Sequence, residues 1–136
     1  MPQAPLPPEL EPFLAKPRPA VVATITEDGS PVSTPTWYEW ADGRLILSMD
    51  ELGHRIQNLR RDPRLTLTVL GDDWYNQVSL LGRMVEEYPD SDWSVTDGLS
   101  QRYLGEPYAE RDFACICVGV DVERWHTFGD PASESE

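Results

Sequence analysis

The segment from residue 54 to residue 64, HRIQNLRRDPR, gathers basic side chains in an otherwise acidic chain. It holds four of the five arginines between positions 44 and 64, whereas the whole sequence has a formal net charge of −13. Arg55 and Asn58 are three residues apart, so they share one face of a helix. A guanidinium is a planar, forked, charged donor that matches the oxygens of a phosphate. The segment therefore predicts an anion site in which Arg55 binds a phosphate.

The same segment has a simpler interpretation, an amphipathic surface helix with a solvated basic face. Tyr38 and His54, the first residue of this segment, are candidates for proton transfer, and a solvated helix residue is the alternative for His54. The chain carries no Ser-His-Asp, Cys-His or paired-carboxylate signature, so the catalytic residues stay unassigned.

Two strands and a helix must position this basic segment. Apolar residues alternate with other side chains over residues 44–49 and again over 64–70, the period of a β-strand. Between the two strands, Leu52, Ile56 and Leu59 recur at i, i+4 and i+7, the spacing of an amphipathic helix. The pattern predicts a strand, a short basic helix and a second strand.

The remaining chain reads as a meander of strands that follow a proline-rich arm. Residues 1–19 contain seven prolines and predict an N-terminal arm that docks on the body through one helical turn and has a frayed tip. Pro35 favours a sheet edge, and Gly82 marks a bulge. We expect a second, weaker helix at 90–104, one domain over 20–128 and a disordered acidic tail at 129–136. The expected strands are 20–26, 31–40, 44–49, 64–70, 74–88 and 113–122.

Bulk properties narrow the function classes. The negative charge disfavours nucleic acid and anionic membranes as partners, because both require a broad basic surface. Without an 18-residue apolar run or a signal peptide, the expected location is the cytoplasm. Cys115 and Cys117 are expected to be reduced core residues, and two histidines with two cysteines predict no metal site. Six antiparallel strands without βαβ alternation predict a mainly β fold, a small barrel with helices on its rim.

Four stretches in this order resemble the split β-barrel family typified by pyridoxamine 5′-phosphate oxidase, and the small members that use the deazaflavin coenzyme F-420 most of all. They are AVVATITEDGSPVSTPTWY, GRLILSMDELGHRIQNLRRDPRLTLTV, VSLLGRMVE and VGVDVERWHTF, which together span about residues 18–128. The second is the most specific. The resemblance implies a six-stranded antiparallel split β-barrel (the FMN-binding split barrel) with short rim helices. It also implies a homodimer whose site lies at the subunit interface.

The resemblance also implies which residues meet the cofactor. Arg55 stands where family members often carry a lysine, a departure that keeps the charge and the donors. Ser48 and Met49 occupy the strand end that usually offers small hydroxyl residues to the phosphate. Four residues are expected to complete the site from the partner chain: Trp74, Tyr75, Trp125 and His126. The implied cofactor-binding residues are Thr34, Pro35, Thr36, Trp37, Ser48, Met49, His54, Arg55, Asn58, Arg60, Arg61, Trp74 and Tyr75.

Three functions follow from the resemblance. The first is an oxidoreductase that binds a phosphate-bearing flavin-type cofactor, coenzyme F-420 in preference to FMN, and transfers a hydride to a small unsaturated or conjugated substrate. The second is a module that binds FMN or a tetrapyrrole without turnover, since a fold does not fix a function. The third is a pyridoxamine 5′-phosphate oxidase, which the short chain and the missing second basic cluster disfavour. For each residue a structural role is the alternative: the tryptophans as core or interface aromatics, and the threonines as ordinary strand residues.

Overall fold

Alternating side chains build the sheet. In β1 (Ala20–Ile25), β4 (Arg44–Asp50) and β5 (Arg64–Leu70), every second side chain is buried. These side chains meet in a core whose fully buried members include Leu45, Leu47 and Leu67. Leu80 joins them from β6 (Gln77–Pro89). The alternation predicted from the sequence for these strands is therefore confirmed.

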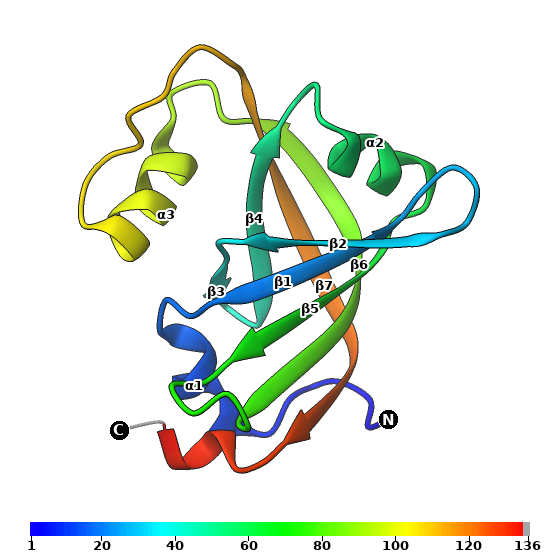
Figure 1. Ribbon diagram of the computed structural model, residues 1–136, viewed down its shortest axis with the longest axis vertical. Helices are drawn as coiled ribbons and strands as arrows, with labels where there is room; N and C mark the ends of the chain where they lie inside the picture. The colour runs from blue at the N-terminus through cyan, green and yellow to red at the C-terminus, as the bar shows by residue number, and fades with distance from the viewer. Residues whose placement is uncertain (135–136) are drawn as a thin grey trace.

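The computed structural model describes residues 1–134. Their seven strands form one antiparallel sheet in the order β2-β1-β5-β6-β7-β4-β3, which curls around the core as a split barrel (Figure 1). The strands not yet bounded are β2 (Pro31–Thr36), β3 (Glu39–Ala41) and β7 (Cys115–Phe128). The helical segments are η1 (Pro8–Leu10), α1 (Glu11–Ala15), α2 (His54–Arg61), α3 (Ser94–Leu104) and η2 (Pro131–Glu134).

The predicted strand at 31–40 is in fact two strands, so that the described chain has seven strands and not six. β2 ends at Thr36, and β3 begins at Glu39 and pairs with β4 instead of β1. Between them Tyr38 is fully buried, and its hydroxyl reaches the carbonyls of Leu14 and Lys16. Burial of this ring turns the chain from one edge of the sheet to the other. β2 forms the edge, as Pro35 predicted.

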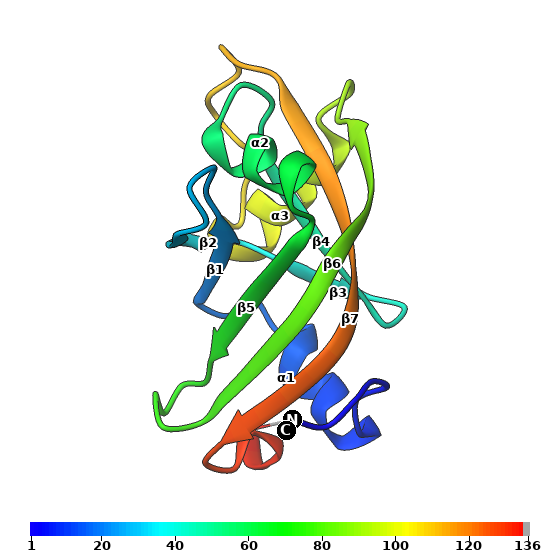
Figure 2. The same cartoon turned by 90° about the vertical axis from the view of Figure 1, so that its right-hand side faces the viewer.

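The long strands β6 and β7 form the spine of the molecule and curve along its whole length (Figure 2). Their pairing shifts register between Leu81 and Gly82, where a bulge was predicted. A Cβ on Gly82 would lie 2.5 Å from the carbonyl oxygen of Asp121, so only glycine permits this approach. β7 extends to Phe128, six residues beyond the prediction, because Arg124–Phe128 pair with Gln77–Leu81. β6 begins at Gln77, since residues 71–76 form a loop.

Helix α2 follows β4 and packs on β1 and β4. Ile56 and Leu59 are buried as predicted, whereas Leu52 is 84% exposed and lies outside the helix. The Asp50 side chain accepts a hydrogen bond from the Leu52 N–H at 2.9 Å, and this turn delays the start of the helix to His54. No helix among residues 1–134 is long and apolar enough to cross a membrane.

Both ends of the described chain, residues 1–134, pack on the body. In the N-terminal arm, Phe13 and Leu14 are fully buried, which confirms the docking. The tip of the arm is bound to β7 through the Ala4 N–H and the Glu123 carbonyl, so the predicted fraying is wrong. The tail is also ordered as far as Glu134, contrary to the predicted disorder from 129. Residues 135 and 136 lie outside the described residues.

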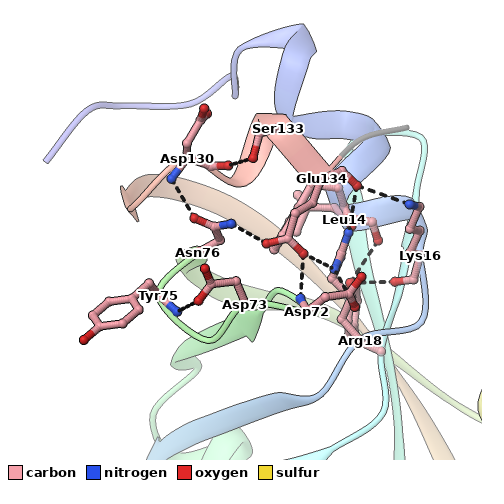
Figure 3. Close-up of polar contacts among 12 residues, drawn as sticks. Leu14, Lys16, Arg18, Asp72, Asp73, Tyr75, Asn76, Asp130, Ser133 and Glu134 are labelled. Atoms are coloured by element: carbon pink, nitrogen blue, oxygen red, sulfur yellow. Dashed lines mark hydrogen bonds and ion pairs between the residues drawn. The ribbon is translucent and has the colours of Figure 1, made fainter.

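Glu134 anchors the tail. Its carboxylate accepts from the Asp72 N–H at 2.6 Å and from the Asn76 side chain, and it pairs with Arg18 at 3.3 Å (Figure 3). The Arg18 side chain is 3% exposed and also donates to the Phe13 carbonyl at 2.8 Å. We call this group the C-terminal clasp: Arg18, Asp72, Asn76 and Glu134.

Candidate functional site

A cleft of about 880 Å³ opens between α3, the end of β4 and the paired strands β1 and β2. Its position follows from the sheet order, because β1 and β4 lie in opposite halves of the sheet and α3 adds Thr96, Leu99 and Tyr103 to the lining. Five residues that the sequence assigned to the site line this cleft: Pro35, Thr36, Trp37, Ser48 and Met49. The arm contributes Pro17 and Pro19 to the same wall.

Aromatic side chains form the far wall of the cleft. The Trp37 ring stacks on Tyr103 of α3, with 5.4 Å between centroids and 13° between planes. Tyr108 meets the edge of Trp37 at 6.0 Å, and Phe113 packs against Tyr108 at 6.2 Å. Sequence reasoning missed Tyr108 and Phe113 as site residues. The signal available was an aromatic-rich, Gly- and Pro-containing loop after α3, which is an unusual composition for a solvated connection.

Arg55 of α2 reaches toward the cleft wall on β2. Its guanidinium donates to the hydroxyls of Thr34 at 2.5 Å and Thr36 at 3.5 Å. The side chain is half-buried, and this desolvation lowers the pKa of Arg55 from its usual value. It forms no ion pair with any carboxylate of residues 1–134. A half-buried cation without a carboxylate partner is suited to binding an anion.

Asn58 and the other arginines of the basic segment have partners within the protein. Arg60 pairs with Glu87 at 2.7 Å, and Arg64 pairs with Asp62 at 2.7 Å. Asn58 is buried and donates to the Thr24 hydroxyl at 3.2 Å, so its role is structural. Arg61 donates to the side-chain oxygen of Asn58 at 3.3 Å. Of the predicted anion contacts on α2, the structure therefore brings only Arg55 to the cleft wall.

Ser48 enters the cleft as the first of three hydrogen-bonded side chains. Its hydroxyl lies 2.7 Å from that of Thr96, which lies 2.7 Å from the carboxylate of Asp90. Asp90 and Thr96 are 5% and 6% exposed. The Asp90 carboxylate also accepts the N–H groups of Val95 and Thr96, and so anchors the start of α3. The sequence analysis did not connect Ser48 with these two residues.

The candidates for proton transfer lie outside the cleft. Tyr38 is fully buried with its hydroxyl on the arm, and burial raises the pKa of that hydroxyl. The prediction that it relays a proton is therefore not supported by its position. His54 is exposed at the first position of α2 and does not line the cleft either.

The aromatic residues assigned to a partner chain lie on another surface. Trp74 and Tyr75 stack at 4.3 Å on the exposed loop after β5, and Phe128 stacks on Tyr75 at 6.3 Å. The Trp125 indole donates to the Gln3 carbonyl of the arm at 3.2 Å, and His126 is exposed. None of these residues lines the cleft of its own chain.

Comparison with known proteins places these features in a family. The model of the pyridoxamine 5′-phosphate oxidase family matches residues 6–128. No curated protein matches the chain. Three solved structures share the fold: an F-420 reductase, a conserved hypothetical protein from Mycobacterium tuberculosis, and a FAD and heme binding protein from Mycobacterium smegmatis.

These three proteins resemble the chain more in structure than in sequence. The F-420 reductase has a TM-score of 0.80 at 22% identity, covering 89% of this chain and 98% of its own. The tuberculosis protein has a TM-score of 0.74 at 25% identity, covering 96% and 89%. The M. smegmatis protein has a TM-score of 0.67 at 16% identity, covering 93% of this chain and 72% of its own. On the family match over most of its length, the chain belongs to the pyridoxamine 5′-phosphate oxidase family.

Proposed function

We propose that the protein is an oxidoreductase that binds a phosphate-bearing flavin-type cofactor, coenzyme F-420 in preference to FMN. The observation that carries the proposal is Arg55, a half-buried guanidinium with two threonine hydroxyls and no carboxylate beside it. A phosphate would supply the missing anion through charge-assisted, bidentate hydrogen bonds. Thr34 and Thr36 hold the guanidinium in place, so little side-chain freedom is lost on binding.

The shape and lining of the cleft fit the ring system of such a cofactor. Its volume of about 880 Å³ lies within the range of small-molecule sites, and its walls are apolar and aromatic. Trp37 and Tyr103 offer flat faces for stacking, while Met49 and Leu99 exclude water. Hydride transfer with a small unsaturated or conjugated substrate is the chemistry that this cofactor class supplies when bound. The chain's own residues would bind and orient the cofactor.

The lining also bears on the substrate. Asp50 and Glu110 are the charged residues that line the cleft in the described chain. Two carboxylates without a lysine or arginine disfavour a second phosphate, and with it a pyridoxamine 5′-phosphate oxidase activity. They favour a neutral or cationic substrate.

The preference for coenzyme F-420 rests on its acidic polyglutamate tail. Arg60, Arg61 and Arg64 follow Arg55 along the chain and offer a basic path. Arg60 and Arg64 are engaged in surface ion pairs with Glu87 and Asp62. Exposed pairs contribute only about 0–1 kcal/mol, so a glutamate tail can exchange with the protein's own carboxylates at little cost. The fold match to an F-420 reductase supports the same preference.

The proposal includes a homodimer with the site at the subunit interface. The exposed stack of Trp74, Tyr75 and Phe128 supports an interface, because contiguous exposed aromatics are unusual on a monomer. Light scattering after size exclusion is expected to give twice the chain mass, and Trp74→Ala is expected to shift the protein toward the monomer. A parent protein that elutes as a monomer at all concentrations would remove this part of the proposal.

The test of the cofactor is a pair of titrations of the apo protein, one with FMN and one with coenzyme F-420, followed by tryptophan fluorescence. Trp37 lines the cleft, so binding is expected to quench it. Arg55→Ala is expected to weaken binding roughly 10- to 100-fold, the effect of losing charged hydrogen bonds to phosphate. Arg83→Ala serves as the matched control, because Arg83 lies on β6 and pairs with Glu123 of β7 instead of reaching the cleft wall on β2. Unchanged affinity in Arg55→Ala would refute the assignment.

Binding of a tetrapyrrole without turnover is the alternative that the same protein preparation tests. The M. smegmatis structure is that of a FAD and heme binding protein, which shares the fold with this chain. Absorbance of the protein as purified separates the two cases, since tetrapyrroles have bands that flavins lack. Tetrapyrrole bands together with no binding of FMN or F-420 would replace the enzyme proposal.

A further inference from the structure

Three side chains, Ser48, Thr96 and Asp90, run in a line from the cleft into the protein. We call them the Ser48 chain. The oxygens of Ser48 and Thr96 are 2.7 Å apart, and those of Thr96 and Asp90 are also 2.7 Å apart. Ser48 and Thr96 line the cleft, whereas Asp90 is 5% exposed and lies behind them. Each link is short enough to be a good hydroxyl hydrogen bond.

The direction of these hydrogen bonds is fixed by the Asp90 carboxylate. One of its oxygens accepts the Thr96 N–H at 2.8 Å, and the other accepts the Val95 N–H at 3.2 Å. An ionised carboxylate can only accept, so the Thr96 hydroxyl must donate its single proton to Asp90. The oxygen of Thr96 is then left to accept, and Ser48 must donate its own proton to it. The free lone pairs of Ser48 remain for the cleft.

From this we infer that Ser48 is a fixed hydrogen-bond acceptor in the cleft, which selects a bound ring by an N–H donor on its edge. The inference deepens the proposed function and rests on it. A phosphate at neutral pH offers only acceptor oxygens, so Ser48 is not its ligand and the phosphate contact suggested by the family resemblance falls to Arg55. An oxidised flavin or deazaflavin ring carries an N–H donor on its imide nitrogen, N3. Ser48 accepts from that group.

The side chain of Ser48 is positioned by the sheet. Ser48 lies in β4 opposite Cys117 of β7. Thr96 is anchored near the start of α3 by the Asp90 carboxylate, which accepts both its N–H and the proton of its hydroxyl. The orientation of Ser48 is therefore built into the strand and the helix before any ligand arrives. Sites built in this way discriminate strongly against analogues that lack the matching donor.

The experiment compares two probes on three proteins. The probes are the cofactor that the parent binds more tightly, FMN or coenzyme F-420, and its N3-methylated derivative, which lacks the imide N–H. Dissociation constants come from tryptophan quenching. The parent is expected to bind the unmethylated probe about tenfold more tightly or better. Ser48→Ala is expected to weaken the unmethylated probe about tenfold and to leave the methylated probe within threefold of the parent.

Thr96→Val and Thr96→Ser separate hydrogen bonding from bulk. Thr96→Val keeps Ser48 and its volume but removes the acceptor for its proton, so the preference for the unmethylated probe is expected to fall at least threefold. Thr96→Ser keeps the hydroxyl and is expected to keep the parent's preference. If the preference for the unmethylated probe were steric, Thr96→Val would keep it. A steric preference would also leave the affinity of Ser48→Ala for the unmethylated probe at the parent's value.

The outcomes distinguish this inference from the proposed function. If Ser48→Ala binds the unmethylated probe as tightly as the parent while Arg55→Ala loses it, the acceptor role is wrong and the cofactor proposal stands. If the parent binds the methylated probe equally well, the acceptor role is also wrong. If the parent binds neither FMN nor coenzyme F-420, both are wrong.

Discussion

At the scale of single residues, the phosphate contact proposed for Arg55 has a cost in stability. The basic segment 54–64 contains four arginines, yet two of them are paired on the surface, and Arg55 alone reaches the cleft wall. A charge that is half-buried without an opposite charge opposes folding, because burial weakens its hydration. Such a residue is retained where a ligand supplies the counter-charge.

Replacing Arg55 by methionine is therefore expected to have opposite effects on stability and on binding. Arg55→Met removes the unpaired charge and keeps most of the side-chain volume, so the apo protein is expected to gain about 1 kcal/mol in the free energy of unfolding. Cofactor affinity is expected to fall at least tenfold. Urea unfolding of the apo protein and fluorescence titration measure the two quantities. Arg55→Lys, which keeps the charge, is the control, and a destabilised Arg55→Met would contradict the prediction.

Tyr38 gives the reverse prediction, a loss of stability without a loss of binding. Its buried hydroxyl lies 3.0 Å from the Leu14 carbonyl and 2.9 Å from that of Lys16. Tyr38→Phe leaves these carbonyls without that donor and is expected to cost about 1 kcal/mol in urea unfolding. Cofactor affinity is expected to stay unchanged, as in the control Tyr88→Phe, at an exposed position of β6 that does not line the cleft. A loss of affinity in Tyr38→Phe alone would return this residue to the site.

At the scale of elements, short-range patterns were predictable and long-range contacts were not. Period-two alternation predicted β1, β4 and β5, and Gly82 predicted the bulge, because both depend on neighbouring residues. The break at Tyr38 depends on contacts with the arm, which is about twenty residues distant. The placement of α3 over the cleft depends on Asp90 and Ser48, which no local pattern joins.

The same reasoning applies to the candidate site. Family resemblance assigned Thr36, Trp37, Ser48 and Met49 to the site, and these residues do line the cleft. Their mutual roles required the structure. The distances in the structure are needed to distinguish Arg55 from the arginines that have partners on the surface. Likewise, the hydrogen bonds of Asp90 are needed to tell that the Ser48 hydroxyl donates its proton to Thr96.

Asp90 is expected to be the main anchor of α3. Its carboxylate accepts two backbone N–H groups and the Thr96 hydroxyl in a buried position. Asp90→Ala leaves these donors unpaired and is expected to lower the free energy of unfolding by about 2–4 kcal/mol, measured in urea. Asp92→Ala is the matched control, because Asp92 is exposed and accepts its hydrogen bonds from the neighbouring Ser94. Equal losses in the two variants would mean that burial of the carboxylate is unimportant.

At the scale of the whole molecule, the C-terminal clasp joins three distant parts of the chain. Glu134 of the tail pairs with Arg18 of the arm and accepts hydrogen bonds from Asp72 and Asn76 in the loop after β5. Pro17 and Pro19 flank Arg18, and both line the cleft. The tail therefore braces one wall of the cleft from behind, although its composition predicted disorder.

Glu134→Gln tests the clasp, because it removes the charge beside the buried Arg18 guanidinium. The melting temperature at neutral pH is expected to fall by roughly 5 °C or more. Glu123→Gln, on the exposed face of β7, is the control and is expected to melt like the parent. A melting temperature of Glu134→Gln equal to that of the parent would mean that the tail rests on the body without bracing it.

The pH dependence gives the clasp a second, independent signature. Hydrogen bonds from the Asn76 side chain and the Asp72 N–H, together with the Arg18 charge, lower the pKa of Glu134 below its usual value of about 4.5. A carboxylate with a lowered folded pKa stabilises the protein fully above the unfolded value, and this contribution is lost as the pH falls through the folded value. The difference in melting temperature between the parent and Glu134→Gln is therefore expected to be largest at neutral pH and to shrink below about pH 4.5. A difference that stays constant into the acid range would show that the carboxylate charge contributes nothing, and that the clasp acts through neutral hydrogen bonds alone.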